Sequence, residues 1–143
     1  MASAFDVAAY VLEKTGPVSA MKLQKLVYYS QAWSLVWDDR CIFQATIQAW
    51  ANGPVIPILY GWHRGEFLIK ECPKGNPDRL SDDERETIGA VVGYYGKKSS
   101  QWLSDLTHSE RPWQEARRGL GPGERGTTPI TPAAMAEYYG SLT

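Results

Sequence analysis

Apolar side chains recur every three or four positions through the first part of the chain, as in helices that bury one face. Ser3 and Asp6 have the spacing of a capping box, and Gly16-Pro17 supplies a stop, so a first helix is predicted between them. Ser19 is suited to cap a second helix, which Asp38-Asp39-Arg40 ends. The stripe of this second helix that is expected to face the core consists of Leu23, Leu26, Val27, Trp33 and Trp37, with Lys22 and Lys25 on other faces.

The period of the pattern changes after Cys41. Apolar and polar residues alternate from Phe43 to Ala51, and this period of two predicts one short strand or a two-stranded β element. Asn52-Gly53-Pro54 then predicts a turn. Pro57 is favoured at the start of a helix, and this helix is expected to be short because Gly65 follows it closely.

The rest of the chain returns to the helical pattern. Ser81 and Glu84 have capping-box spacing, and apolar residues continue at helical intervals until Gly96. A further helix is predicted to begin at Ser99 or Ser100. Each of these predictions depends only on residues close together in the sequence.

Two more short helices complete the prediction. Pro112 opens the first, and Thr131-Pro132 caps and opens the last. Residues 70–78 are expected to form a surface loop, and the glycine-rich residues 119–128 a flexible loop. The expected fold is therefore mainly α, one compact domain over residues 1–143 with about six helices and a small strand or β-hairpin element.

The composition is that of an ordinary domain with nearly balanced charge. Of the 143 residues, 43% are hydrophobic and 22% are charged, which excludes a wholly disordered chain. The formal net charge of −1 provides no strong overall field for nucleic acid or a membrane surface. No export signal is visible, and polar residues and prolines interrupt the longest uncharged stretch, so we expect a cytoplasmic protein without a membrane span.

Residue types that usually carry chemistry are few. His63 and His108 are the only histidines, and neither has a second His or Cys at metal-ligand spacing, so neither a metal site nor a cofactor is expected. Cys41 and Cys72 are expected to be reduced and partly buried. No motif favours a catalytic site, and we expect a protein that is not an enzyme. A hydrolase built from one of these cysteines and a histidine is the less favoured alternative.

Large aromatic rings are abundant, with six tryptophans and eight tyrosines. A domain of this size cannot easily bury them all, so at least one of Trp37, Trp62 and Trp113 is expected to be exposed in the free protein, as hot-spot residues often are. A DNA-binding regulator is the other alternative, since the first two helices imitate a helix-turn-helix. The second of them is rich in aromatic residues and poor in arginine, which disfavours binding in a major groove.

Three segments together resemble a known family. Residues 21–33, MKLQKLVYYSQAW, look like the K-L-Q-K-L-x-Y-Y-x-Q-x-W signature of the Panacea antitoxin domain, the SocA-like and phage-associated GepA-like group. Residues 47–57 are similar to its I-x-A-W-x-x-G-P-V-x-P, residues 106–113 to its L-T-H-x-E-x-P-W, and residues 130–139 to its last helix. The family-motif residues are Lys22, Leu23, Gln24, Lys25, Leu26, Tyr28, Tyr29, Gln31, Trp33, Ala49, Trp50, Gly53, Pro54, Val55, Pro57, Thr107, His108, Glu110, Pro112 and Trp113.

The resemblance covers nearly the whole chain and implies a helical antitoxin that needs no cofactor. Such a protein binds a cognate toxin, often encoded beside it, and neutralises it by direct contact. Members pair with toxins of unrelated folds, so the identity of the toxin does not carry over, and the oligomeric state is not predicted. SocA-like members are linked to protease-dependent toxin turnover, which adds a cellular protease as a further partner. Some members carry an extra DNA-binding region, for which this chain has no spare length.

Motif residues also have structural interpretations. Gly53 and Pro54 are expected to shape a turn, and Thr107 to cap a helical start near His108. A partner surface is expected among the large rings, although burial alone would explain each of them. The alternative partner surface is a polar face that bears Lys22 and Lys25. The residues hypothesised to contact the partner are Tyr28, Trp37, Trp50, Trp62, His63 and Trp113.

Overall fold

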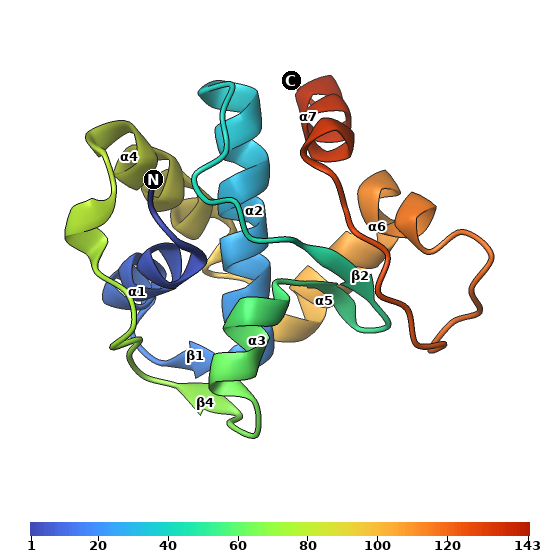
Figure 1. Cartoon of the computed structure of the whole chain (residues 1–143), viewed down its shortest axis with the longest axis horizontal. Helices are drawn as coiled ribbons and strands as arrows, with labels where there is room; N and C mark the ends of the chain where they lie inside the picture. Colours follow the sequence, from blue (N-terminus) through green and yellow to red (C-terminus); the bar gives the residue numbers. More distant parts are fainter.

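Helix α2 (Ala20–Trp37) runs through the middle of the computed structural model, which describes residues 1–143, and the other elements pack around it. Figure 1 shows α1 and α4 on one side of α2, and α6 and α7 on the other. The remaining helices are α1 (Ala4–Thr15), α3 (Pro57–His63), α4 (Asp82–Tyr95), α5 (Ser100–Ser109), α6 (Arg111–Ala116), α7 (Pro132–Ser141) and the 3-10 helix η1 (Pro77–Arg79).

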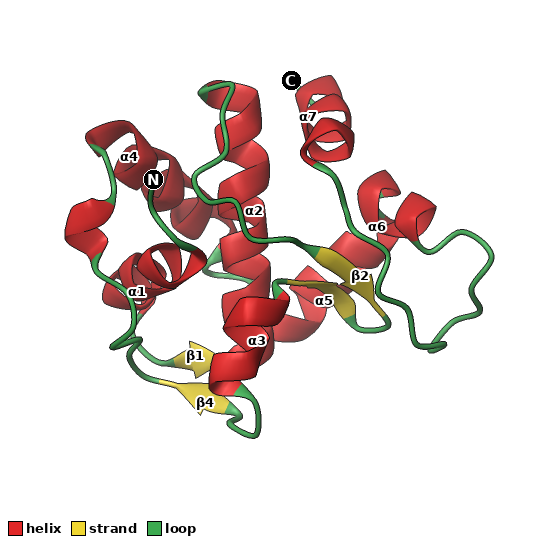
Figure 2. Cartoon of the chain, viewed as in Figure 1, coloured by secondary structure: helices red, strands yellow, loops and turns green.

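The β structure is small, as Figure 2 shows, and forms two antiparallel pairs of strands. The mainly α fold class predicted from the pattern is therefore confirmed, with one helix more than the expected number. None of the helices is long and apolar enough to span a membrane. The strands are β1 (Val18–Ser19), β2 (Gln48–Trp50), β3 (Gly53–Val55) and β4 (Leu68–Ile69).

Helix boundaries follow the local signals. Ser3 Oγ accepts a hydrogen bond from the Asp6 amide at 3.3 Å, and the Asp6 carboxylate accepts one from the Ser3 amide at 2.8 Å. Ser81 and Glu84 form the same capping box at the start of α4. These reciprocal bonds satisfy amides that have no partner within a helix, so they fix where each helix begins.

The alternating segment from Phe43 to Ala51 is mostly not a strand, which corrects the prediction. Only Gln48–Trp50 pairs, and it joins β3 in a hairpin with Trp50 opposite Gly53. Ala51 and Asn52 form the turn, and Gly53, which was expected there, begins β3. The backbone before Gln48 is held by a side chain from α2, described below, so it needs no neighbouring strand.

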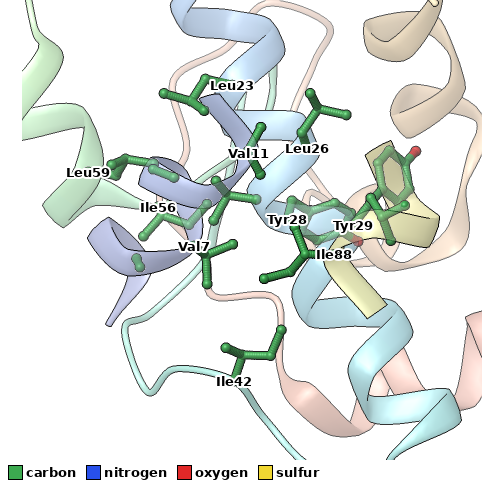
Figure 3. Packing of buried hydrophobic residues seen from close by; sticks show 14 of the residues in the cluster. Val7, Val11, Leu23, Leu26, Tyr28, Tyr29, Ile42, Ile56, Leu59 and Ile88 are labelled. Carbon is green, nitrogen blue, oxygen red and sulfur yellow. The ribbon is translucent and has the colours of Figure 1, made fainter. Parts of the chain in front are cut away.

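Helix α2 is buried on nearly every face, and this corrects the expectation that it has one apolar stripe. Lys25 was expected on another face, yet its side chain is fully buried. The helix is surrounded because α1 and α4 pack against it from one side and α7 from the other. Figure 3 shows Leu23 and Leu26 of α2 in the same packed cluster as Val7 and Val11 of α1 and Ile56.

Two further expectations are corrected in the C-terminal half. Thr107 does not cap a helix, because it lies inside α5, where its hydroxyl donates to the Ser104 carbonyl at 2.9 Å. The last helix continues past Gly140 to Ser141. Residues 119–128 contain no helix or strand, in agreement with the predicted loop, while its flexibility stays a prediction.

Candidate functional site

The amide of Gln24 holds the start of α3. Its Oε1 accepts a hydrogen bond from the Ile56 amide at 2.8 Å, and its Nε2 donates to the Ile56 carbonyl at 3.3 Å. The same nitrogen lies 3.0 Å from Nε2 of His63, at the other end of this short helix. Burial lowers the pKa of His63, which favours the neutral ring that can accept this bond. A single motif side chain therefore fixes both ends of α3.

Gln31 does the same for the irregular segment before β2. Its Oε1 accepts from the amides of Ile42 and Phe43 at 2.8 and 3.3 Å, and its Nε2 donates to the Phe43 carbonyl at 2.7 Å. Buried backbone groups need such partners wherever no strand supplies them. Both motif glutamines thus act as replacements for a β ladder.

Three tyrosines and one acid form a polar centre where α2, α5, α6 and α7 meet. Glu110 Oε1 accepts hydrogen bonds from the hydroxyls of Tyr29 at 2.8 Å and Tyr139 at 2.7 Å. The hydroxyls of Tyr28 and Tyr139 are 2.9 Å apart. Burial raises the pKa of Glu110, and the two hydroxyls oppose this effect. The centre joins α7 to the rest of the domain.

The last motif segment holds the hairpin and the glycine-rich loop. Trp113 donates from Nε1 to the Trp50 carbonyl at 2.8 Å, and the His108 ring stacks on Trp113 with ring centres 4.2 Å apart. The Arg117 guanidinium also lies over the Trp113 ring. It donates hydrogen bonds to the carbonyls of Ala49 and of the loop residues Gly121 and Glu124. Stacking and hydrogen bonds thus hold the hairpin and the loop to this segment, while the buried Nε2 of His108 has no hydrogen-bond partner.

Lys25, like His108, is a polar motif residue with a buried nitrogen that has no hydrogen-bond partner. Burial lowers its pKa to about 8. The side chain lies against Gly53, where a Cβ atom would be 3.0 Å from Cε and 3.3 Å from Nζ of Lys25. The close approach of the hairpin to α2 thus depends on a glycine at this position.

The residues hypothesised to contact a partner are spread over different surroundings. Tyr28 and His63 are only 1% and 3% exposed, so they lie out of a partner's reach. Of the alternative polar face, Lys25 is buried and Lys22 is partly exposed. Trp50, Trp62 and Trp113 are partly buried, whereas Trp37 is 50% exposed. Trp37 is thus the member of the hypothesised set that the structure leaves most accessible.

Trp37 borders an apolar surface that the motifs did not reveal. A hollow of about 390 Å³ lies between the C-terminal part of α2, α4 and the end of α7, and every residue that lines it is hydrophobic. Tyr94 is 61% exposed and Leu142 55% exposed. The sequence held a signal for Tyr94, because Tyr95 belongs to the apolar stripe of this helix and the next side chain on a helix is turned about 100° away from it. The residues of this α2–α4–α7 groove are Trp33, Trp37, Ala90, Val91, Tyr94, Tyr95 and Leu142.

The cysteines and histidines occupy four separate environments. Cys41 borders the surface between α2 and α7, and Cys72 is buried near α1, while His63 and His108 contact Gln24 and Trp113 as described. Burial raises the pKa of both thiols, which favours the less nucleophilic protonated form. No group of three or more His, Cys, Asp or Glu side chains is arranged to hold a metal ion.

Comparison with known proteins gives two matches. The family described as "Antitoxin SocA-like, Panacea domain" matches residues 23–114, which contain most of the family-motif residues. The chain is also similar to Antitoxin SocA of Caulobacter vibrioides (strain NA1000 / CB15N), with 29% identity over 133 residues that cover 80% of this chain and 70% of that protein. No solved structure matches the chain.

Proposed function

This chain belongs to the SocA-like Panacea antitoxin family, and from this membership we propose that it neutralises a cognate toxin in the cytoplasm by binding it directly. The proposed activity is binding rather than catalysis, which agrees with the motif residues described above, whose roles are packing and backbone support. The partner has to meet the domain at its surface, away from the buried motif side chains.

The α2–α4–α7 groove is the observation that supports this proposal best. Trp37, Tyr94 and Leu142 each leave half or more of their side chains exposed around one hollow. Large rings in such a position are costly to leave in water and are enriched among the residues that dominate protein interfaces. We propose this groove as the main contact for the toxin.

Delivery of the toxin to a cellular protease is a second role that the same contact would serve. Neutralisation by binding alone leaves the amount of toxin unchanged, whereas an adaptor that delivers the toxin to a protease shortens the lifetime of the toxin. The half-life of the toxin in cells, measured with and without this chain, separates the two mechanisms.

The test uses the protein encoded by the reading frame beside this one, expressed from an inducible promoter. We expect its expression alone to stop growth, co-expression with this chain to restore growth, and the two purified proteins to co-elute as a complex. An unrelated toxin of different fold is the control for general protection. Failure of this chain to restore growth while it is expressed and folded would contradict the proposal.

A further inference from the structure

We propose that the α2–α4–α7 groove receives an α-helix of the toxin that has an apolar face and carries a Lys or Arg at the end lying over Asp38, Asp83 and Glu86. This inference deepens the proposed function and rests on it for the identity of the partner.

The groove does not end at its apolar walls. A second hollow of about 340 Å³ shares Trp37 and Ala90 with it and is lined beyond them by Asp38, Asp83 and Glu86. The two hollows therefore form one continuous surface, apolar along most of its length and acidic at one end.

The carboxylates at this end keep much of their charge free for a partner. The side chain of Glu86 takes part in no hydrogen bond or ion pair, and Asp83 is 3.8 Å from Arg40 in a pair of exposed side chains. Such an exposed pair contributes little and is easily exchanged. Asp38 accepts from the Thr87 hydroxyl at 2.9 Å and sits at the C-terminal end of α2, where the helix dipole adds negative potential.

A lysine lies beside the opposite end of the groove. Lys98 places its amine 5.9 Å from the centre of the Tyr94 ring, on the far side of the groove from Glu86 along α4. A helix with a basic end is attracted over the carboxylates and repelled near Lys98. The charge distribution therefore favours one orientation of the helix in the groove.

The length of the groove also fits a helix. Asp83, Ala90 and Tyr94 lie at helical spacing along one side of α4, and the eleven residue-to-residue steps from Asp83 to Tyr94 span about 16.5 Å at the rise of an α-helix. A partner helix laid along this side would match it with about three turns. Its apolar residues at i, i+3/i+4 and i+7 would face Trp37, Ala90 and Leu142, as in other groove-bound helices.

Three stapled helical peptides of about 12 residues test the proposal on the isolated chain. The first has a leucine stripe and two arginines at one end, the second replaces the arginines by glutamates, and the third scrambles the leucines. Binding is measured by the change in tryptophan fluorescence and by calorimetry. We expect the first peptide to bind at least about tenfold more tightly than either of the others. Equal binding of the basic and acidic peptides would overturn the proposal.

Two variants locate the binding. Ala90→Arg places a long side chain across the exposed floor of the groove, and Glu86→Lys reverses the charge of the free carboxylate. Both positions are exposed on α4, so the fold is expected to survive, and unchanged circular dichroism and midpoint of thermal unfolding verify this. We expect each variant to weaken binding of the first peptide at least about tenfold. Glu13→Lys, the same charge change on an exposed position of α1, is the matched control.

The remaining outcomes are also decisive. A dimer of the parent that Ala90→Arg dissociates would show that a second copy of this chain covers the groove, and would overturn the proposal. If the Ala90→Arg chain restores growth as strongly as the parent does, the groove is not the binding site of the toxin, and the antitoxin function is left intact. If the parent does not restore growth, the antitoxin function is refuted. The peptide measurements then still decide whether the groove binds an apolar helix with a basic end.

Discussion

At the scale of single residues, polar side chains of the family motif supply hydrogen-bond partners to buried groups, as a neighbouring strand or a helix cap does in other folds. Gln24 and Gln31 each bind a backbone segment by both ends of an amide, and Glu110 binds two tyrosine hydroxyls. Sequence reasoning found these residues through the family resemblance, but it did not find their roles. Each role depends on a partner far along the chain, which no local pattern encodes.

Lys25 differs from these side chains, because its buried amine forms no hydrogen bond. A charged group costs free energy in such a place, and its lowered pKa of about 8, against 10.5 in the unfolded chain, measures this cost. Between these two values the unfolded state binds more protons than the folded state. The contribution of Lys25 to stability is therefore most favourable above about pH 10.5 and is lost as the pH falls to about 8.

We predict that Lys25→Met raises the free energy of unfolding at pH 7 by about 3 kcal/mol, because it replaces the buried cation by an apolar side chain of similar length. The advantage of the variant should shrink as the pH rises above 8. Urea unfolding at several pH values between 7 and 9.5 measures both effects. Lys22→Met alters a partly exposed lysine of the same helix and should leave the parent's pH dependence unchanged. A variant less stable than the parent at pH 7 would contradict the prediction.

At the scale of elements, the helices and the presence of a small β element were predictable, whereas the extent of β2 and the β1–β4 pair were not. Capping signals lie within three residues of one another, so Ser3 and Ser81 correctly marked the starts of α1 and α4. The pairing of β1 with β4 joins Val18 to Ile69, and its short strands have no periodicity to detect. The all-round burial of α2 was also missed, because its polar residues look exposed until their distant partners are known.

Two glycines on neighbouring elements allow a matched test of what the hairpin requires. Gly53 has φ +128°, and a Cβ there would approach both Lys25 and Thr107, whereas Gly61 lies in α3 with open space around it. We predict that Gly53→Ala lowers the free energy of unfolding by more than about 1 kcal/mol. Gly61→Ala should raise it by about 0.5–1 kcal/mol, because alanine is favoured over glycine inside a helix.

Chemical denaturation of both variants beside the parent measures these two changes, and their opposite signs are the result that matters. A Gly53→Ala chain as stable as the parent would show that the hairpin can move away from α2 at little cost. The motif glycine would then need an explanation other than this close approach.

At the scale of the whole molecule, the motif and the proposed partner surface are largely separate, and of the motif residues only Trp33 lines the groove. The motif residues converge on the interior, where they hold the hairpin, α3 and α7 against α2, and the α2–α4–α7 groove lies at the edge of this framework. The sequence anticipated that a large ring would be exposed, and Trp37 is such a ring. It did not reveal that α4 and α7 complete a groove around it, because only tertiary packing brings these elements together.

This separation predicts that affinity for the toxin and stability of the domain respond to different residues. Trp37→Ala should weaken binding of the neutralised neighbouring-gene product by roughly thirtyfold or more, since truncating a hot-spot residue typically costs 2 kcal/mol or more. The loss of stability should be smaller, because half of the Trp37 side chain is already in water and its main internal contact is the stacked ring of Trp33.

Trp102→Ala is the matched control for this experiment, because Trp102 is 39% exposed on α5 and is not among the residues that line the groove. Its own contact is the amine of Lys98, 4.7 Å from the ring centre, so its removal changes exposed aromatic area without opening the core. Calorimetric titration with the toxin and thermal unfolding of the free chains give the two quantities for each variant. Equal losses of affinity in the two variants would show that the toxin does not distinguish the groove from the rest of the aromatic surface. A loss of affinity in Trp37→Ala that follows its loss of stability would assign Trp37 to the framework instead of the interface.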